Sequence, residues 1–131
     1  MLPVLIDSSV LIALLDQQDK HHNKCVEKVL NDQVHINAAT ISITECLIRP
    51  FKLESYFAYL VLSNLNSIVD RFHALTQSIA IDAANVRAVK NLSTADSIIL
   101  ATALSLGAPL WSCDKKLVNA DRNTIYVGDL N

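Results

Sequence analysis

The sequence predicts an α/β domain with a mainly parallel sheet that is covered by helices on both faces. The first reason is an alternation, in which short apolar runs are separated by longer segments whose apolar residues recur every three or four positions. The second reason is size and composition. The chain has 131 residues, of which 51% are hydrophobic and 18% are charged, so we expect one core and a single domain over residues 1–131.

The N-terminal half alternates short apolar runs with helical patterns. Strands are predicted over residues 3–6 and 34–37, and helices over residues 9–16, 21–30, 40–48 and 53–65. The helix over residues 40–48 is expected to end before Pro50, because proline disfavours helical geometry at the residue that precedes it.

The C-terminal half continues the alternation. Strands are predicted over residues 68–72, 109–111 and 124–127, and helices over residues 75–89 and 93–106. The apolar stripe of the first helix consists of Leu75, Ile79, Ala83 and Val86. The second helix is almost wholly apolar after Asp96, which predicts that it is buried, and Gly107 is expected to end it.

The composition excludes several classes of protein. With only two glycines, Gly107 and Gly128, the chain cannot contain a glycine-rich phosphate-binding loop. Its apolar runs fall well short of the ~20 residues that cross a bilayer, and Asp7 interrupts the N-terminal run too early for a signal peptide. We therefore expect a cytosolic protein that makes no membrane contact.

Cysteine usage, charge and hydropathy add weaker constraints. The three cysteines, Cys25, Cys46 and Cys113, form no CxxC pair, so reduced and mostly buried thiols are expected. The net charge of −2 neither favours nor excludes nucleic acid, because the carboxylates of a metal site can cancel a basic rim. The mean hydropathy of +0.30 hints at an apolar self-association surface.

Four acidic residues stand beside apolar elements: Asp7, Glu45, Asp96 and Asp114. In a parallel α/β sheet, ligands bind beyond the carboxyl ends of the strands. Asp7 follows the first predicted strand, and Asp114 follows the strand over residues 109–111, so both stand where that rule expects chemistry.

Each acid also has a purely structural explanation. Asp7 could cap the helix that follows it, and the fourth acid could be a turn residue or a cap. Asp96 lies three residues after Ser93, and Glu45 lies three residues after Ser42, which is the spacing of a capping box. For any single acid, the structural explanation is the stronger one.

Taken together, the acids favour a metal site. Glu45 and Asp96 lie within very apolar helices, where acids are seldom buried unless they are paired or bind a metal. No Lys or Arg stands three or four positions from Asp96. Converging carboxylates would repel one another unless a cation neutralised them, and hard oxygen ligands suit Mg²⁺ or Mn²⁺.

The segments that carry these acids resemble the PIN domain family, and especially the VapC-type toxins of toxin–antitoxin pairs. They run in the family's order through nearly the whole chain: D-S-S-V-L, T-E-C-L-I-R-P, T-A-D-S-I-I-L-A-T-A and W-S-C-D-K-K-L. The third segment, followed by Gly107, Ala108 and Pro109, is the most specific. Cys113 departs from the pattern, because the family often has a polar residue there.

The resemblance implies an α/β/α sandwich and an endoribonuclease that depends on Mg²⁺ or Mn²⁺. By motif position, the catalytic and metal-binding acids would be Asp7, Glu45, Asp96 and Asp114, with Ser9 and Ser112 as supporting hydroxyls. The resemblance also implies an RNA substrate, a homodimer and a cognate antitoxin whose basic side chain enters the acidic site. An alternative is a PIN-like module that binds RNA, cleaves it weakly and acts outside a toxin–antitoxin pair.

Other enzyme classes fit the sequence less well. A phosphatase of the haloacid dehalogenase type needs a second Asp where Ser9 stands, and a receiver domain needs an acidic pair before its phosphorylated Asp. Neither pattern is present. A zinc site that uses His21, His22 and Cys25 would lack its second pair of ligands.

Basic and aromatic residues leave two questions open. The basic side chains near the acids are Arg49, Lys52, Lys115 and Lys116, which could contact RNA phosphates or could simply be solvated. The aromatic side chains Tyr56, Phe57 and Tyr59 are expected in the core or on a dimer surface rather than as platforms for stacked bases.

Overall fold

A computed structural model describes residues 1–130, and its centre is a parallel sheet. Within those residues the sheet has five strands, β1 (Pro3–Ile6), β2 (His35–Ala39), β3 (Arg71–His73), β4 (Leu110–Ser112) and β5 (Thr124–Tyr126), in the order β3-β2-β1-β4-β5. Every neighbouring pair of strands is parallel. The prediction of a mainly parallel sheet is therefore confirmed.

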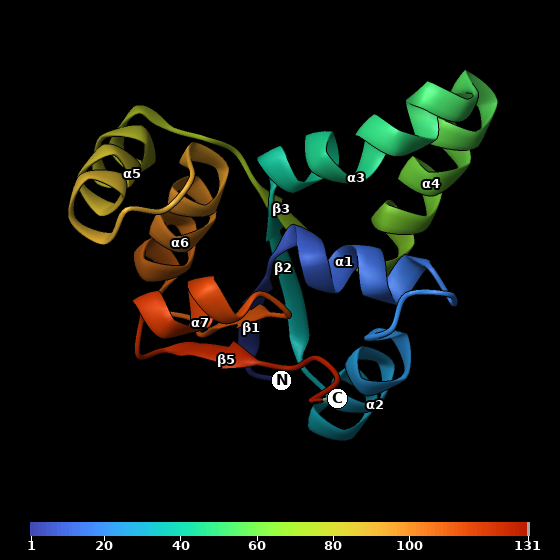
Figure 1. Cartoon of the computed structure of the whole chain (residues 1–131), viewed down its shortest axis with the longest axis horizontal. Helices are drawn as coiled ribbons and strands as arrows, with labels where there is room; N and C mark the ends of the chain where they lie inside the picture. The colour runs from blue at the N-terminus through green and yellow to red at the C-terminus, as the bar shows by residue number, and fades with distance from the viewer. Residues whose placement is uncertain (131) are drawn as a thin grey trace.

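Helices cover both faces of the sheet. The helices of residues 1–130 are α1 (Ser8–Leu15), α2 (His22–Asp32), α3 (Thr40–Leu53), α4 (Ser55–Ile68), α5 (Gln77–Lys90), α6 (Thr94–Leu106) and α7 (Lys115–Ala120). Figure 1 shows α1 to α4 on one side of the sheet and α5 to α7 on the other. The chain is thus a three-layer α/β/α sandwich, as the resemblance implied.

The side chains of β1 explain why both faces are covered. Val4 and Ile6 belong to a core that the sheet shares with α1 to α4, whereas Leu5 between them belongs to a second core with α5, α6 and α7. All three side chains are buried. A strand that is buried on both faces is a continuous apolar run rather than an alternation of apolar and polar residues, and residues 3–6 have this character.

The prediction that Pro50 ends a helix was wrong, because α3 continues to Leu53. Pro50 has no N–H to donate, but its carbonyl still accepts a hydrogen bond from the Glu54 N–H at 2.9 Å. Pro50 and Leu53 line a groove together with Phe57 of α4. We infer that apolar packing in the α3–α4 hairpin outweighs the one hydrogen bond that the proline removes.

Two differences concern the C-terminal half. Ile79, Ala83 and Val86 are buried along α5 as predicted. Leu75 lies before the helix, because Thr76 caps the N-terminus, and it is 48% exposed. The sequence pattern does not predict α7. Its six residues are too few to show a helical period.

Helix α6 is buried as its apolar sequence predicts. Residues 97–103 are all buried, and Gly107 ends the helix in the left-handed conformation with φ of 64°. Although α6 is strongly apolar, it has 13 residues. Among residues 1–130, no helix combines the length and the apolar character that crossing a bilayer requires.

Candidate metal centre

The candidate site starts at Asp7, directly after β1 at the carboxyl edge of the sheet. Its backbone N–H donates to the carbonyl of Trp111 at 3.1 Å, so it is held against β4. Its side chain is buried and accepts hydrogen bonds from the Val10 N–H at 3.0 Å and from the hydroxyls of Ser9 and Ser112 at 2.5 Å each. Asp7 therefore caps α1 and also presents a carboxylate at the edge of the sheet.

Ser9 and Ser112 act as matched bridges between Asp7 and the turn that joins β4 to α7, which we call the β4–α7 turn (residues 112–114). The Ser9 Oγ accepts a hydrogen bond from the Cys113 N–H, and the Ser112 Oγ accepts one from the Asp114 N–H, both at 2.9 Å. Each serine thus donates to Asp7 and accepts from the turn. The turn and the carboxylate are held in one hydrogen-bonded unit.

Glu45 lies on α3, and its carboxylate is held by Ser8, which the sequence patterns did not single out. The Ser8 hydroxyl donates to the Glu45 Oε1 at 2.5 Å and lies 3.1 Å from the Ser42 Oγ. Ser42 is buried inside α3, which begins at Thr40, so the alternative explanation of Glu45 as part of a capping box does not hold. The sequence signal for Ser8 is the Ser doublet that follows Asp7, of which the family resemblance assigns a supporting position only to Ser9.

Asp96 and Asp114 lie at the N-terminal ends of two helices. The Asp96 N–H donates to the Ser93 hydroxyl at 3.1 Å, so Ser93 is the cap of α6. The Asp114 side chain accepts a hydrogen bond from the Lys116 N–H at 2.9 Å and caps α7. Asp96 is half-buried and Asp114 is exposed. The structural explanation of Asp114 therefore holds as well.

Electrostatics join the four acids into one cluster, which we call the acidic cluster. Burial, with a smaller contribution from the charge of Asp96, raises the pKa of Asp7 to about 6 against the opposing hydrogen bonds. Burial also raises the pKa of Asp96, and the charges of Asp114 and Glu45 add to that effect, while a hydrogen bond with the Ser93 side chain and the charge of Lys116 oppose it. Within residues 1–130, no Lys or Arg forms an ion pair with any of these acids.

The donor chemistry of the acidic cluster fits a hard divalent cation. Carboxylate oxygens are the ligands that Mg²⁺ and Mn²⁺ prefer. Burial raises the pKa of Asp7 and of Asp96, and a bound cation would offset that cost of ionisation. Within residues 1–130, no three Asp, Glu, His or Cys side chains already stand close enough to hold an ion together. An ion would therefore have to draw the more exposed acids towards Asp7.

An apolar groove starts at the acidic cluster. Glu45 and Arg49 of α3 line it, together with Ile12 and Leu15 of α1 and Phe57 of α4. The carboxylate of Glu45 thus lies at the groove, and most of the other side chains that line it are hydrophobic. Phe57 is 43% exposed in this groove.

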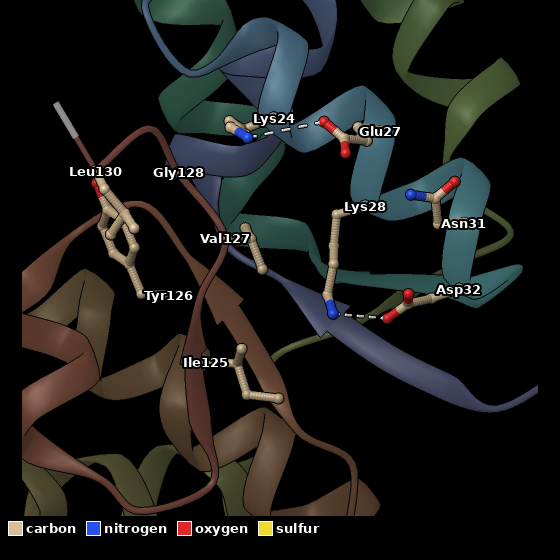
Figure 2. A pocket seen from close by; sticks show the side chains of 10 residues that line it. All are labelled: Lys24, Glu27, Lys28, Asn31, Asp32, Ile125, Tyr126, Val127, Gly128 and Leu130. Atoms are coloured by element: carbon tan, nitrogen blue, oxygen red, sulfur yellow. Dashed lines mark ion pairs between the residues drawn. The ribbon is translucent and has the colours of Figure 1, made fainter.

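A second surface pocket lies apart from the acids, between α2 and the segment that follows β5 (Figure 2). Its two lysines are paired, because Lys24 lies 3.9 Å from Glu27 and Lys28 lies 2.8 Å from Asp32. Since these pairs neutralise the basic side chains, the pocket has little attraction for a phosphate.

The raised pKa of Asp7 predicts how the stability of the metal-free protein depends on pH. A carboxyl whose pKa is higher in the folded state than in the unfolded chain stabilises the fold at low pH and loses that contribution as the pH rises through about 6. We expect the contribution of Asp7 to the free energy of unfolding in EDTA to fall by about 2 kcal/mol between about pH 4.5 and about pH 7. Urea unfolding at a series of pH values across that range measures the free energy of unfolding.

Asp7→Asn should remove this fall, and Asp82→Asn on the exposed side of α5 should keep it. Equal pH profiles for Asp7→Asn and the wild type would show that Asp7 does not titrate in this range.

Comparisons with known proteins agree with the fold. A family model described as the PIN domain matches residues 4–123. A toxin–antitoxin complex from Klebsiella pneumoniae is similar in structure, with a TM-score of 0.77 and 19% identity over 93% of this chain and 95% of that chain. The sarcin-ricin loop cleaving toxin VapC20 from Mycobacterium tuberculosis has a TM-score of 0.73 and 14% identity over 89% and 94% of the two chains.

FitAcB from Neisseria gonorrhoeae is similar too, with a TM-score of 0.72 and 16% identity over 95% of this chain and 96% of that chain. No curated protein matches the chain in sequence. The solved structures are similar at the level of the fold. The family model, in contrast, matches the sequence from β1 through α7 and takes in all four acids. This chain therefore belongs to the PIN domain family.

Proposed function

We propose that this protein is a metal-dependent endoribonuclease and the toxin of a type II toxin–antitoxin pair. The observation that carries the proposal is the acidic cluster, in which a buried, hydrogen-bonded Asp7 shares its surroundings with three further carboxylates and no paired cation. Membership of the PIN domain family and the similarity to toxins of known structure support the same function.

In this proposal, Asp7, Glu45, Asp96 and Asp114 hold Mg²⁺ or Mn²⁺. The ion supplies water activation and stabilises charge on the scissile phosphate. The chain's own residues orient the ligands. Ser9 and Ser112 donate to Asp7, and Ser8 holds the Glu45 carboxylate. Because hydroxyl donors favour the ionised form of a carboxyl, they keep the ligands ready to bind a cation.

The basic residues near the acidic cluster suit the RNA backbone. Arg49 and Lys52 follow Glu45 on α3, and Lys115 and Lys116 follow Asp114 on α7. All four side chains are exposed. In the proposal they bind phosphates on either side of the acids, which would otherwise repel the substrate.

The first test is RNA cleavage. Asp7→Asn and Asp96→Asn should each abolish cleavage while the fold persists, because an amide keeps the shape of the side chain and loses its charge. EDTA should abolish cleavage by the wild type, and Mg²⁺ or Mn²⁺ should restore it. Asp82→Asn serves as the matched control and should cleave normally.

Full activity of either active-site variant would rule out these roles. A wild type that binds RNA but shows no metal-dependent cleavage would favour the alternative, an RNA-binding module.

The second test separates a metal ligand from a helix cap at Asp96. Saturating Mg²⁺ should stabilise the wild type by mass action, by about 2.7 kcal/mol at a hundredfold excess over the dissociation constant. Asp96→Asn should melt at the same temperature or higher in EDTA, since repulsion within the acidic cluster falls. The same variant should gain less from Mg²⁺, since a ligand is gone. Thermal melts in both conditions measure this.

A cap predicts a different result. Loss of an acid in the first turn of a helix costs a few tenths to ~1 kcal/mol whether or not metal is present. An equal drop in melting temperature in EDTA and in Mg²⁺ would therefore leave Asp96 as a structural residue only.

The apolar groove supports an antitoxin partner. A segment with apolar side chains could occupy the wall formed by Ile12, Leu15 and Phe57, and an adjacent Arg or Lys would then reach Glu45 and the other acids. That cation would neutralise the cluster in place of a metal. The toxin–antitoxin complexes among the similar structures favour such an occupant over other proteins.

The expected partner is the product of a short reading frame beside the gene. Co-expressed with that product, the wild type should co-purify as a complex and lose RNA cleavage. Phe57→Asp should weaken the complex, because it puts a charge into the groove. Ile81→Asp is the control, since Ile81 is 63% exposed on α5 in the opposite layer.

Replacing the antitoxin's Arg or Lys by Gln should relieve inhibition more than it weakens binding. A protein that stays free of that product, and is not inhibited by it, would contradict this assignment.

The outer face of the α3–α4 hairpin supports a homodimer. Phe51 and Tyr59 pack edge to face with ring centroids 5.7 Å apart, yet both remain exposed, as do Tyr56 and Leu60. Tyr56, Phe57 and Tyr59 are 69%, 43% and 62% exposed, which contradicts a place in the core, so the proposal keeps the dimer surface from the prediction. In the proposal, a second copy of the chain covers these side chains.

A further inference from the structure

Two cysteines meet beside the acidic cluster. The Sγ atoms of Cys25 and Cys113 are 3.5 Å apart, although 88 positions separate them in the sequence. Cys25 lies on α2 and is fully buried, with its sulfur 3.9 Å from the carbonyl of Val127. Cys113 lies in the β4–α7 turn and is partly exposed. Both are free thiols in this structure.

We propose that Cys25 and Cys113 form an oxidation site, at which a hydroperoxide converts the two thiols into an intramolecular disulfide. A covalent S–S bond is about 2.05 Å long, so the two sulfurs have only about 1.5 Å to close. Cys46, the third cysteine, is buried on α3 and forms no hydrogen bond with either sulfur among the described residues. The proposal therefore selects one of the three possible pairs.

The chemistry balances with hydrogen peroxide as the oxidant. The peroxide oxidises the accessible Cys113 thiol to a sulfenic acid, as its O–O bond breaks and one water leaves. The Cys25 sulfur then attacks the Cys113 sulfur, the S–O bond breaks, and the hydroxide takes up the Cys25 proton to leave as a second water. Two thiols and one peroxide thus give one disulfide and two waters.

The first step is expected to be slow. Cys113 is only partly exposed, which limits the access of a peroxide to its sulfur. Pairing should still outcompete overoxidation, because Cys25 is already in contact with the sulfur that is oxidised.

The disulfide should disturb the acidic cluster, a consequence that rests on the proposed function. The Cys113 N–H donates to Ser9, and its neighbours Ser112 and Asp114 are hydrogen-bonded to each other. A shift of the turn towards α2 would strain the serine bridges that hold Asp7. Loss of such support costs metal sites about 10-fold or more in affinity.

The direct test is a peptide map. Reduced protein is treated with hydrogen peroxide, alkylated under denaturing conditions and digested without reductant. We expect a monomer that is lighter by two hydrogens, carries alkyl groups only at Cys46 and yields a linked pair of peptides containing Cys25 and Cys113. Cys46→Ala should give the same link, whereas Cys25→Ala and Cys113→Ser should not.

Sulfinic or sulfonic acid at Cys113 without a link, or a link to Cys46 or to a second chain, would overturn the proposal.

The effect on the site is read from Mn²⁺ binding, measured by calorimetry on the reduced and the oxidised protein. Oxidation should weaken binding about 10-fold, dithiothreitol should restore it, and Cys113→Ser should bind Mn²⁺ equally well before and after peroxide. Equal affinity of the linked and the reduced protein would overturn the coupling. A reduced protein that binds no Mn²⁺ would count against the proposed function and the coupling together, while the peptide map would still decide the disulfide.

Discussion

The buried carboxylate of Asp7 is the constraint on which the rest of the site depends. An ionised carboxyl group that leaves water must be hydrogen-bonded or neutralised, or it protonates. Three donors meet Asp7, from Val10, Ser9 and Ser112, and still the pKa stands near 6. The fold therefore keeps a group whose charge is only partly satisfied. Both serines tie that charge to the β4–α7 turn, so a change at Asp7 reaches Asp114 and Cys113.

The four acids of the acidic cluster differ in burial, and a buried acid and an exposed acid would act differently on an ion. Asp7 is buried, Glu45 and Asp96 are half-buried, and Asp114 is exposed. A buried, preorganised ligand sets the position of an ion, whereas exposed ligands can move with ion and substrate. The groove is lined by Glu45, which belongs to the same cluster. A basic side chain held in that groove and a divalent ion would therefore compete for the same carboxylates. Inhibition by a partner and activation by a metal would then share one electrostatic cause.

The sequence predicted the layers, and it singled out the four acids of the proposed site, but it did not show how these acids are held. Residues 3–6 and 93–106 carry patterns long enough and apolar enough to predict a buried strand and a buried helix, and Gly107 marked a helix end. The prediction that a helix ends before Pro50 was wrong, because it took no account of the packing of α3 against α4. The contact of Ser8 with Glu45 spans 37 positions, and that of Cys25 with Cys113 spans 88. No local spacing encodes such pairs, since the topology of the sheet brings them together.

The protonation of Asp7 with and without metal tests the central claim most directly. The carboxyl ¹³C resonance of Asp7 can be followed by NMR from about pH 4 to about pH 8, first in EDTA and then in saturating Mg²⁺. A bound cation favours the ionised form, so the midpoint should stand near 6 in EDTA and fall by well over one unit in Mg²⁺. The same midpoint in both conditions would mean that no ion approaches Asp7, and the site would then be a helix cap without a metal.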